Sequence, residues 1–245
     1  MEEQNNRGLI ASIVFAGVAI AGSVVFFALQ SGVSDEEFAK RINDGIKAYV
    51  AQETGTAAPV EVDEDELIED QPFLGDEDAP VTIVEFSDYL CGYCQLFHNE
   101  SWEALKENYI ETGKVKFVYR DFLLGYDGDY EAAMVAECAR DQEGDEAFFA
   151  MHDEIFATIG GGFDLDNYVI YGEEIGLDGE ELRECVENEE FGDEILADGE
   201  YGRSLGVRGT PAFYVNDEFV SGAMAYEDLA ALIDSKLGGR LSLWE

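Results

Sequence analysis

Basic residues are scarce in this sequence. Lysine and arginine together number 14 against 55 aspartates and glutamates, which gives a formal net charge of −41. A surface this acidic repels nucleic-acid phosphates, so the composition argues against a nucleic-acid-binding protein. The acidic residues occur throughout the polar part of the chain, which favours a protein adapted to high salt, that is, a halophilic one. The alternative is an acidic extracytoplasmic protein without that adaptation.

Cysteine is also scarce. Four cysteines in 245 residues are too few for a disulfide-stabilised scaffold, so any cysteine chemistry is local. Large apolar residues are not scarce, because Leu, Ile, Val and Phe account for 67 residues, or about 27 %. Charged chains stay disordered below roughly 20 %. We therefore expect a real core, in one large domain with additional segments or in two small domains.

One long uncharged run lies near the start of the chain. Residues 8–29 span about 33 Å as a helix, enough to cross a bilayer. A cleavable signal peptide has a shorter apolar region, although Ala19–Ala21 resembles a cleavage site. We favour a retained single-pass anchor in the cell membrane. Basic residues lie on both sides of it, but a short tail at 1–7 is easily left in the cytoplasm, so the bulk of the chain is expected outside.

Two segments follow this predicted anchor. Ser34 and Glu37 have capping-box spacing, and apolar residues then recur at helical intervals, so we expect a juxtamembrane amphipathic helix at 34–52. The stretch 53–78 is acidic, contains two prolines and shows no clear period. It is expected to be an acidic linker.

A strand–helix–strand pattern begins the main domain. Val81–Phe86 is β-rich and apolar, a helical pattern runs from Cys91 to about Glu111, and Val115–Tyr119 is a second short strand. A βαβ unit of this length predicts parallel strands.

Helical patterns dominate the next part of the chain. They are predicted at Tyr130–Arg140, Asp145–Ile159, Asp166–Ile175, Asp178–Asn188 and Asp193–Leu205. Strands Ala212–Val215 and Glu218–Val220, a tight turn at Asn216–Asp217 and a helix from Tyr226 to Leu237, ended by Gly238 and Gly239, complete the domain. The predicted domain spans 79–239, with a helical insertion at about 126–190.

The two cysteines at the start of the first helix carry the chemistry. Amide protons and the helix dipole stabilise a thiolate at a helix N-terminus, so Cys91 is expected to have a lowered pKa and to act as the nucleophile. Cys94, one turn further along, is placed to resolve a mixed disulfide. Half of a zinc site has the same spacing, but no second pair of ligands completes four. We therefore predict a redox pair and neither a metal nor a cofactor.

Two motifs, Glu85-Phe-Ser-Asp-Tyr-Leu-Cys-Gly-Tyr-Cys94 and Gly209-Thr-Pro-Ala-Phe213, resemble the DsbA-like branch of the thioredoxin superfamily over roughly residues 74–238. The resemblance implies an α/β thioredoxin fold with an inserted helical domain. It implies that Pro211 is the cis-proline facing the cysteines and that the backbone of Thr210 pairs with an extended substrate. It also implies that Glu85 is a buried acid that handles the proton of Cys94.

The resemblance implies a thiol:disulfide oxidoreductase that forms disulfides in secreted proteins. Gly92-Tyr93 lacks the histidine of strongly oxidising members and, with Thr210, is similar to the disulfide isomerases. An isomerase or a reductase is therefore the second expectation, and a non-enzymatic chaperone or metal-delivery module is the alternative of another class. The family implies reduced secreted proteins as substrates and a membrane partner of the DsbB or vitamin-K-epoxide-reductase type.

The remaining candidate residues have mostly structural interpretations. Oxidising surroundings favour a disulfide between Cys138 and Cys185, as in some relatives, although two separate buried thiols are the alternative. His98 is expected to have a structural role or to tune the thiols, and His152 to pack between helices. Caps and turns are expected at four aspartates, for which a weak Ca²⁺ site is the alternative: Asp127, Asp129, Asp164 and Asp166.

Overall fold

The computed structural model describes residues 62–159 and 163–241. Within these ranges no helix combines the length and the apolar character needed to span a bilayer. The predicted anchor at 8–29 and the predicted helix at 34–52 lie outside the described residues.

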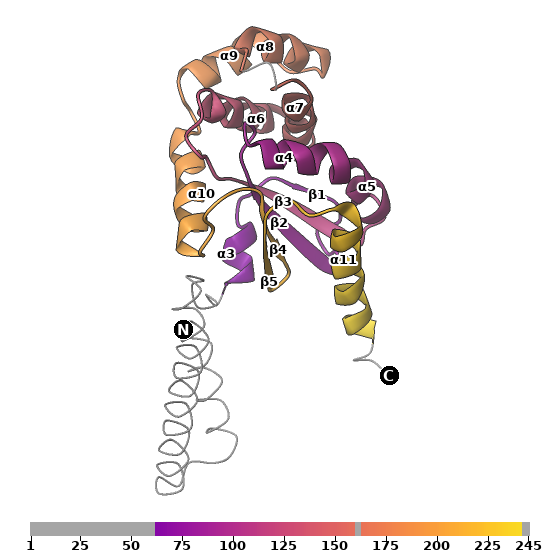
Figure 1. Cartoon of the computed structure of the whole chain (residues 1–245). Coiled ribbons are helices and arrows are strands. Elements are labelled where there is room, and N and C mark those ends of the chain that lie inside the picture. Colours follow the sequence, from indigo (N-terminus) through magenta and orange to yellow (C-terminus); the bar gives the residue numbers. More distant parts are fainter. Residues whose placement is uncertain (1–61, 160–162, 242–245) are drawn as a thin grey trace, which may run out of the picture. The chain divides into compact units, whose positions relative to one another are not determined.

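A five-stranded sheet with the order β1-β3-β2-β4-β5 forms the centre of the domain (Figure 1). Its strands are β1 (Phe73–Leu74), β2 (Val81–Ser87), β3 (Val115–Asp121), β4 (Ala212–Val215) and β5 (Glu218–Ser221). β2 and β3 are parallel, as the βαβ pattern predicted, and the other neighbouring strands are antiparallel. The side chain of Asn216 fixes the β4–β5 turn by accepting a hydrogen bond from the N–H of Thr82 at 2.8 Å.

A single helical run connects β2 to β3. It consists of α4 (Gly92–Phe97), a π-helical stretch η1 (His98–Trp102), α5 (Glu103–Leu105) and a second π-helical stretch η2 (Lys106–Ile110). The sequence predicted this helix and its end near Glu111. The two π-helical stretches have no signal in the sequence that we recognise.

The side chains of the strands alternate between two cores. Ile83, Phe117 and Phe213 face the larger core, which includes the helical run after β2 and α11 (Tyr226–Leu241). Val84 and Tyr214 point to the opposite face, which is covered by α3 (Glu64–Ile68) and α10 (Gly192–Ser204). The period of two along each buried strand therefore divides the helices into two layers around the sheet (Figure 1).

The predicted helical insertion lies between β3 and β4. Its helices are α6 (Asp129–Glu143), α7 (Asp145–Thr158), α8 (Leu165–Glu174) and α9 (Gly179–Glu187), followed by α10. Cys138 of α6 and Cys185 of α9 are joined by a disulfide. Asp164 caps α8, and the carboxylate of Asp129 accepts hydrogen bonds from two backbone N–H groups of the preceding turn.

Two expectations about the ends of the domain were wrong. The stretch 53–78 was expected to be a linker, but from residue 62 it forms α3 and β1, because Leu67 is buried and Phe73 pairs with Val118 of β3. The last helix was expected to end at Gly238, but it continues to Leu241. A glycine costs a helix only about 1 kcal/mol relative to alanine, so it does not always end one.

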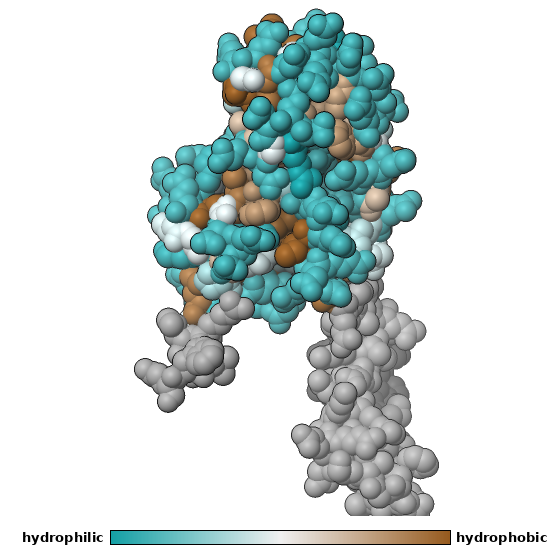
Figure 2. Space-filling view, turned by 180° about the vertical axis from the view of Figure 1, so that it is seen from behind, coloured by the Kyte–Doolittle hydropathy of each residue, from teal (hydrophilic) through white to brown (hydrophobic). Residues whose placement is uncertain are grey.

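The surface reflects the acidic composition. Figure 2 shows mostly hydrophilic residues on the face seen from behind, around a smaller apolar area. Among the described residues, the exposed large apolar side chains include Tyr93 and Leu96 on α4 and Leu124 and Tyr126 after β3. Tyr93 lies between Cys91 and Cys94, Leu96 lies two residues after Cys94, and Leu124 and Tyr126 lie in the segment that follows β3.

Candidate active site

Cys91 and Cys94 lie at the start of α4. Cys91 is the N-cap residue, and its Sγ is 3.4 Å from the carbonyl oxygen of Thr210, which lies in the loop before β4. Cys94 is one turn further along and fully buried. Both are free thiols. The fold thus brings the cysteine pair next to a loop that is 119 positions away in the chain.

The surroundings of Cys91 favour its thiolate. A hydrogen bond from the Cys94 thiol is the largest influence that lowers the pKa of Cys91 to about 5, against the opposing effect of burial. The backbone N–H groups of Tyr93 and Cys94 lower it further. These surroundings favour the thiolate form of Cys91, which is the direction expected for a cysteine at a helix N-terminus.

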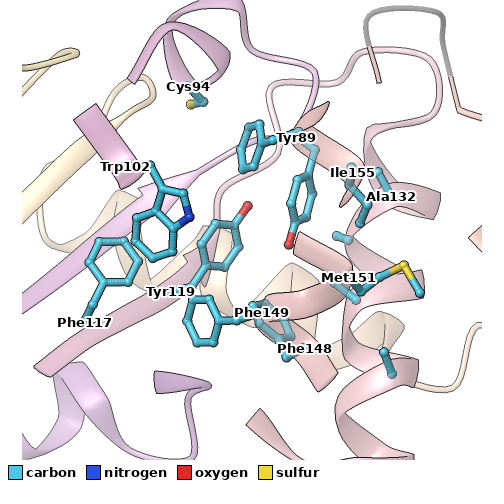
Figure 3. Packing of buried hydrophobic residues seen from close by; sticks show 14 of the residues in the cluster. Tyr89, Cys94, Trp102, Phe117, Tyr119, Ala132, Phe148, Phe149, Met151 and Ile155 are labelled. Atoms are coloured by element: carbon cyan, nitrogen blue, oxygen red, sulfur yellow. The ribbon is translucent and has the colours of Figure 1, made fainter. Parts of the chain in front are cut away.

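Cys94 has the opposite character. Burial raises its pKa well above the ordinary value, and the hydrogen bond to Cys91 and the charge of Glu85 raise it further. Figure 3 shows Cys94 beside the buried aromatic cluster that includes Trp102 and Tyr119. The two sulfurs therefore differ, with a nucleophilic Cys91 and a protonated Cys94.

Glu85 lies in the buried part of β2, where its register partners are Tyr119 in β3 and Phe213 in β4. The pKa of Glu85 is raised to about 8, mainly by burial. The Ser87 side chain partly opposes this shift, and the charge of Cys91 adds to it. A carboxyl with this pKa exchanges a proton near neutral pH. Its location agrees with the expected buried acid beneath the cysteine pair.

The Thr210–Pro211 peptide bond is cis. The ladder between β2 and β4 begins at Ala212, so the backbone of Thr210 lies outside the sheet pairing. The Thr210 hydroxyl is buried without a hydrogen-bond partner among the described residues. All five residues that the motifs singled out thus occur in one neighbourhood.

A family model described as thioredoxin matches residues 68–235 of this chain. The chain belongs to this thioredoxin family. Its relatives place it in the DsbA-like branch, so the chain is a thiol:disulfide oxidoreductase. The family therefore accounts for the α/β fold with its helical insertion and for the enzyme class.

Three relatives illustrate the match. "Disulfide bond formation protein D" of Bacillus subtilis is 27 % identical over 181 residues, covering 71 % of this chain and 80 % of the relative. "Probable disulfide bond formation protein D" of Bacillus anthracis is 30 % identical over 176 residues, covering 68 % and 78 %. The crystal structure of alpha-DsbA1 from Wolbachia pipientis superposes with a TM-score of 0.66 at 25 % identity, covering 75 % of this chain and all of that one.

A change at Glu85 should alter how the free energy of unfolding of the reduced protein depends on pH. Its folded-state pKa of about 8 exceeds the ordinary value of 4.5, so its stabilisation is complete below about pH 4.5 and is lost as the pH rises to about 8. Linkage gives a loss of about 2 kcal/mol between pH 6 and pH 8. Cys91, whose pKa is lowered to about 5, contributes in the opposite direction over this range, so the test is the difference between two proteins: relative to the unsubstituted protein, we expect Glu85→Gln to lack this loss in urea unfolding. Exposed Glu107→Gln is the control, and an unchanged pH dependence in Glu85→Gln would contradict the assignment.

Asp88 joins the cysteine loop to the segment after β3, a role that the sequence analysis did not predict. Its carboxylate accepts hydrogen bonds from the N–H of Leu90 at 2.8 Å and of Leu124 at 2.7 Å. Burial raises its pKa to about 6. The sequence does contain an indication of this role. An aspartate at the first position of a turn often accepts a hydrogen bond from the backbone N–H two residues later, as Asp88 does from Leu90.

His98 and His152 meet at Asp153 and not at the thiols. The Oδ1 atom of Asp153 lies 3.3 Å from Nε2 of His98, 3.0 Å from Nδ1 of His152 and 2.7 Å from Nε1 of Trp102. The two histidines and Asp153 place their ligand atoms within 4.8 Å of one another, as a metal site requires. However, the Lys106 ammonium group lies 2.9 Å from Oδ2, so a cation already neutralises this carboxylate. We therefore assign a structural hydrogen-bond network, consistent with the structural roles expected for both histidines.

Removal of the Asp153 charge should destabilise the folded protein. Its hydrogen bonds to His152 and His98 and the Lys106 charge hold its pKa far below the ordinary value despite burial, so its stabilisation is present above about pH 4 and is lost at lower pH. We expect Asp153→Asn to lose about 2 kcal/mol at pH 7, the range for hydrogen bonds to a charged group. Urea unfolding at pH 7 and pH 3 tests this, with exposed Asp141→Asn as the control. A variant that loses as much stability at pH 3 as at pH 7 would contradict the charge-based explanation.

Proposed function

We propose that this oxidoreductase acts as an oxidant, forming disulfides in secreted proteins by transfer of its Cys91–Cys94 disulfide. The observation that supports this direction is the difference between the two thiols. A Cys91 thiolate with a pKa of about 5 stabilises the reduced form. A stabilised reduced form makes the corresponding disulfide a stronger oxidant.

The reaction is two thiol–disulfide exchanges. In the first, a substrate thiolate attacks Sγ of Cys91 in the oxidised pair, the bond to Cys94 breaks, and Cys94 leaves as a thiolate that takes up a proton. Glu85, with a pKa of about 8, is the group we propose to supply that proton. In the second, another substrate thiolate attacks the substrate sulfur of the mixed disulfide and releases Cys91 as its stable thiolate. The substrate loses two electrons, and the Cys91–Cys94 pair gains them.

The backbone of Thr210 is the proposed docking edge for the substrate segment. Thr210 lies outside the β4 ladder and beside Sγ of Cys91, so an extended peptide can add to the loop as a further strand. Pro211 follows directly, before β4 begins at Ala212. The reactive sulfur and the pairing edge therefore belong to one surface.

An extracytoplasmic location fits this proposal. The Cys138–Cys185 disulfide is typical of an oxidising compartment, and the uncharged run at 8–29 has the length of a membrane anchor. The reduced pair must pass its two electrons on to be used again. A membrane partner of the DsbB or vitamin-K-epoxide-reductase type is proposed for that step.

The reduction potential of the Cys91–Cys94 pair tests the direction. We expect a value of about −100 to −200 mV, the range of oxidants and isomerases, and not the value of about −270 mV of a reductant. The measurement is equilibration of the protein with defined ratios of reduced and oxidised glutathione. A value below about −250 mV would contradict the proposal and support the reductase. Repair of a scrambled disulfide protein, compared with oxidation of a reduced one, separates an isomerase from an oxidant.

A further inference from the structure

A groove lies beside the loop that leads to Thr210. It has a volume of about 410 Å³ and is lined by Phe122, Leu123, Leu124, Arg203, Val207 and Arg208. One wall of the groove is tied to the active site, because Asp88 binds the N–H of Leu124 on that wall and the N–H of Leu90, next to Cys91. The opposite wall continues through Gly209 to Thr210. The groove is therefore fixed relative to the reactive sulfur.

Among the described residues, no carboxylate holds either arginine of the groove in place. The guanidinium group of Arg203 lies over the ring of Phe122, 5.0 Å from its centre. Nη1 of Arg208 donates to the carbonyl oxygens of Arg203 and Val207, each at 2.8 Å. These contacts orient both groups and leave other N–H donors available for a ligand.

The lack of acidic partners is unexpected in this chain. Acidic residues outnumber basic ones by 55 to 14, and among the described residues Arg120, Arg140 and Arg183 all form ion pairs. Within the same ranges neither Arg203 nor Arg208 does. Two arginines that have no acidic partner among the described residues therefore share the groove beside the loop that leads to Thr210.

We propose that this groove binds an acidic side chain of the substrate, in the extended segment that carries the reactive cysteine. The inference rests on the proposed function and names its substrate class. Arginine forms paired hydrogen bonds with a carboxylate, and the apolar floor of the groove accommodates the methylene groups of a glutamate. Arg208 precedes Thr210 by two residues and an extended chain advances about 3.3 Å per residue. The acidic residue therefore stands about two or three positions from the cysteine.

Matched peptides test this selectivity. Each reduced peptide carries one pair of cysteines and either Glu or Gln, placed in turn at each of the three positions on either side of the reactive cysteine. The oxidised full-length protein is mixed with each peptide, and disulfide formation is followed by chromatography. We expect Glu to raise kcat/KM about 5- to 10-fold over Gln at one of these positions, as one partly exposed charged hydrogen bond allows.

Substitutions assign the effect to the groove. Arg203→Gln and Arg208→Gln should each bring the Glu-to-Gln ratio close to 1, whereas Arg183→Gln, a control in α9, should preserve it. Because Arg208 also binds the end of α10, Arg208→Lys keeps the charge and should retain part of the ratio. If Arg208→Gln does not fold, Arg203→Gln decides alone.

The outcomes separate the two proposals. Equal oxidation of Glu and Gln peptides at every position overturns the acidic-substrate inference and leaves the oxidant function standing. A preference for Glu that survives both arginine substitutions also overturns the inference, because the selectivity then arises elsewhere. A protein that oxidises none of the peptides overturns the proposed function, and the inference with it.

Discussion

Substitution of Cys94 by serine will leave Cys91 joined to its partner proteins as stable mixed disulfides. Cys91 is the sulfur that bonds to partner proteins. Its thiolate is stabilised at the start of α4, where its pKa is about 5. Cys94 is buried and protonated. It is the leaving group when the Cys91–Cys94 disulfide is attacked, and in the reverse of that step it is the thiol that can release a partner held on Cys91. Without Cys94 the active-site disulfide cannot form and no neighbouring thiol resolves a mixed disulfide on Cys91. The covalent complex therefore accumulates, and turnover falls by more than about 10³-fold, the order seen when one member of a catalytic unit is removed.

The converse substitution is the control. Cys91→Ser should be equally inactive but should trap few partners, because the remaining thiol is inaccessible. Non-reducing gels and mass spectrometry of complexes recovered from cells provide the comparison, and thiolate absorbance against pH locates the pKa of Cys91. Trapping by Cys91→Ser as efficient as by Cys94→Ser would show that the two roles are reversed. A Cys91 thiolate that forms only near pH 8.5, as in a free cysteine, would remove the basis of the mechanism.

Removal of the second disulfide should cost the protein about 4 kcal/mol of unfolding free energy. Cys138 and Cys185 are 47 positions apart and join α6 to α9 within the insertion. In the chain-entropy model, a closed loop of this size restricts the unfolded chain by about that amount. We therefore expect Cys138→Ala combined with Cys185→Ala to lower the midpoint of urea unfolding markedly.

The comparison is made in a variant in which Cys91 and Cys94 are both replaced by serine, so that Cys138–Cys185 is the one disulfide that can form. Unfolding of this variant with and without the Cys138–Cys185 pair gives the difference directly. Thiol counting under denaturing conditions checks the bond itself. Two reactive thiols in protein never exposed to a reductant would show that the pair is not bonded.

Much of the fold was predictable because its elements have strong local patterns. β2 is an apolar run followed by a turn, and the helices of the insertion begin at residues such as Asp178, whose side chain caps α9. α3 and β1 were not predictable for the opposite reason. Each is very short, and each is held by a long-range contact, such as the pairing of Phe73 with Val118, in a stretch whose composition is that of a linker.

The active site divides in the same way. Cys91, Cys94 and Glu85 stand within one short motif, and Thr210 and Pro211 in another, so a resemblance to a family could identify all five. Arg203 and Arg208 have no motif, because the groove that they line depends on how α10 leads into the loop before β4. Asp153 likewise gains its role only when α7 packs against the helical run that carries His98, Trp102 and Lys106.

The short segment before β2 has a consequence for association between molecules. Phe73 and Leu74 occupy the outer edge of β3, Pro72 accepts the N–H of Tyr119, and the backbone of α3 binds the guanidinium group of Arg120. A chain shortened to begin at residue 79 would uncover that edge of β3, with free backbone donors and acceptors along a strand that is otherwise buried. Such edges recruit strands from other molecules and lead to aggregation. By covering this edge of β3, the acidic segment 62–78 protects the enzyme from strand pairing with other copies.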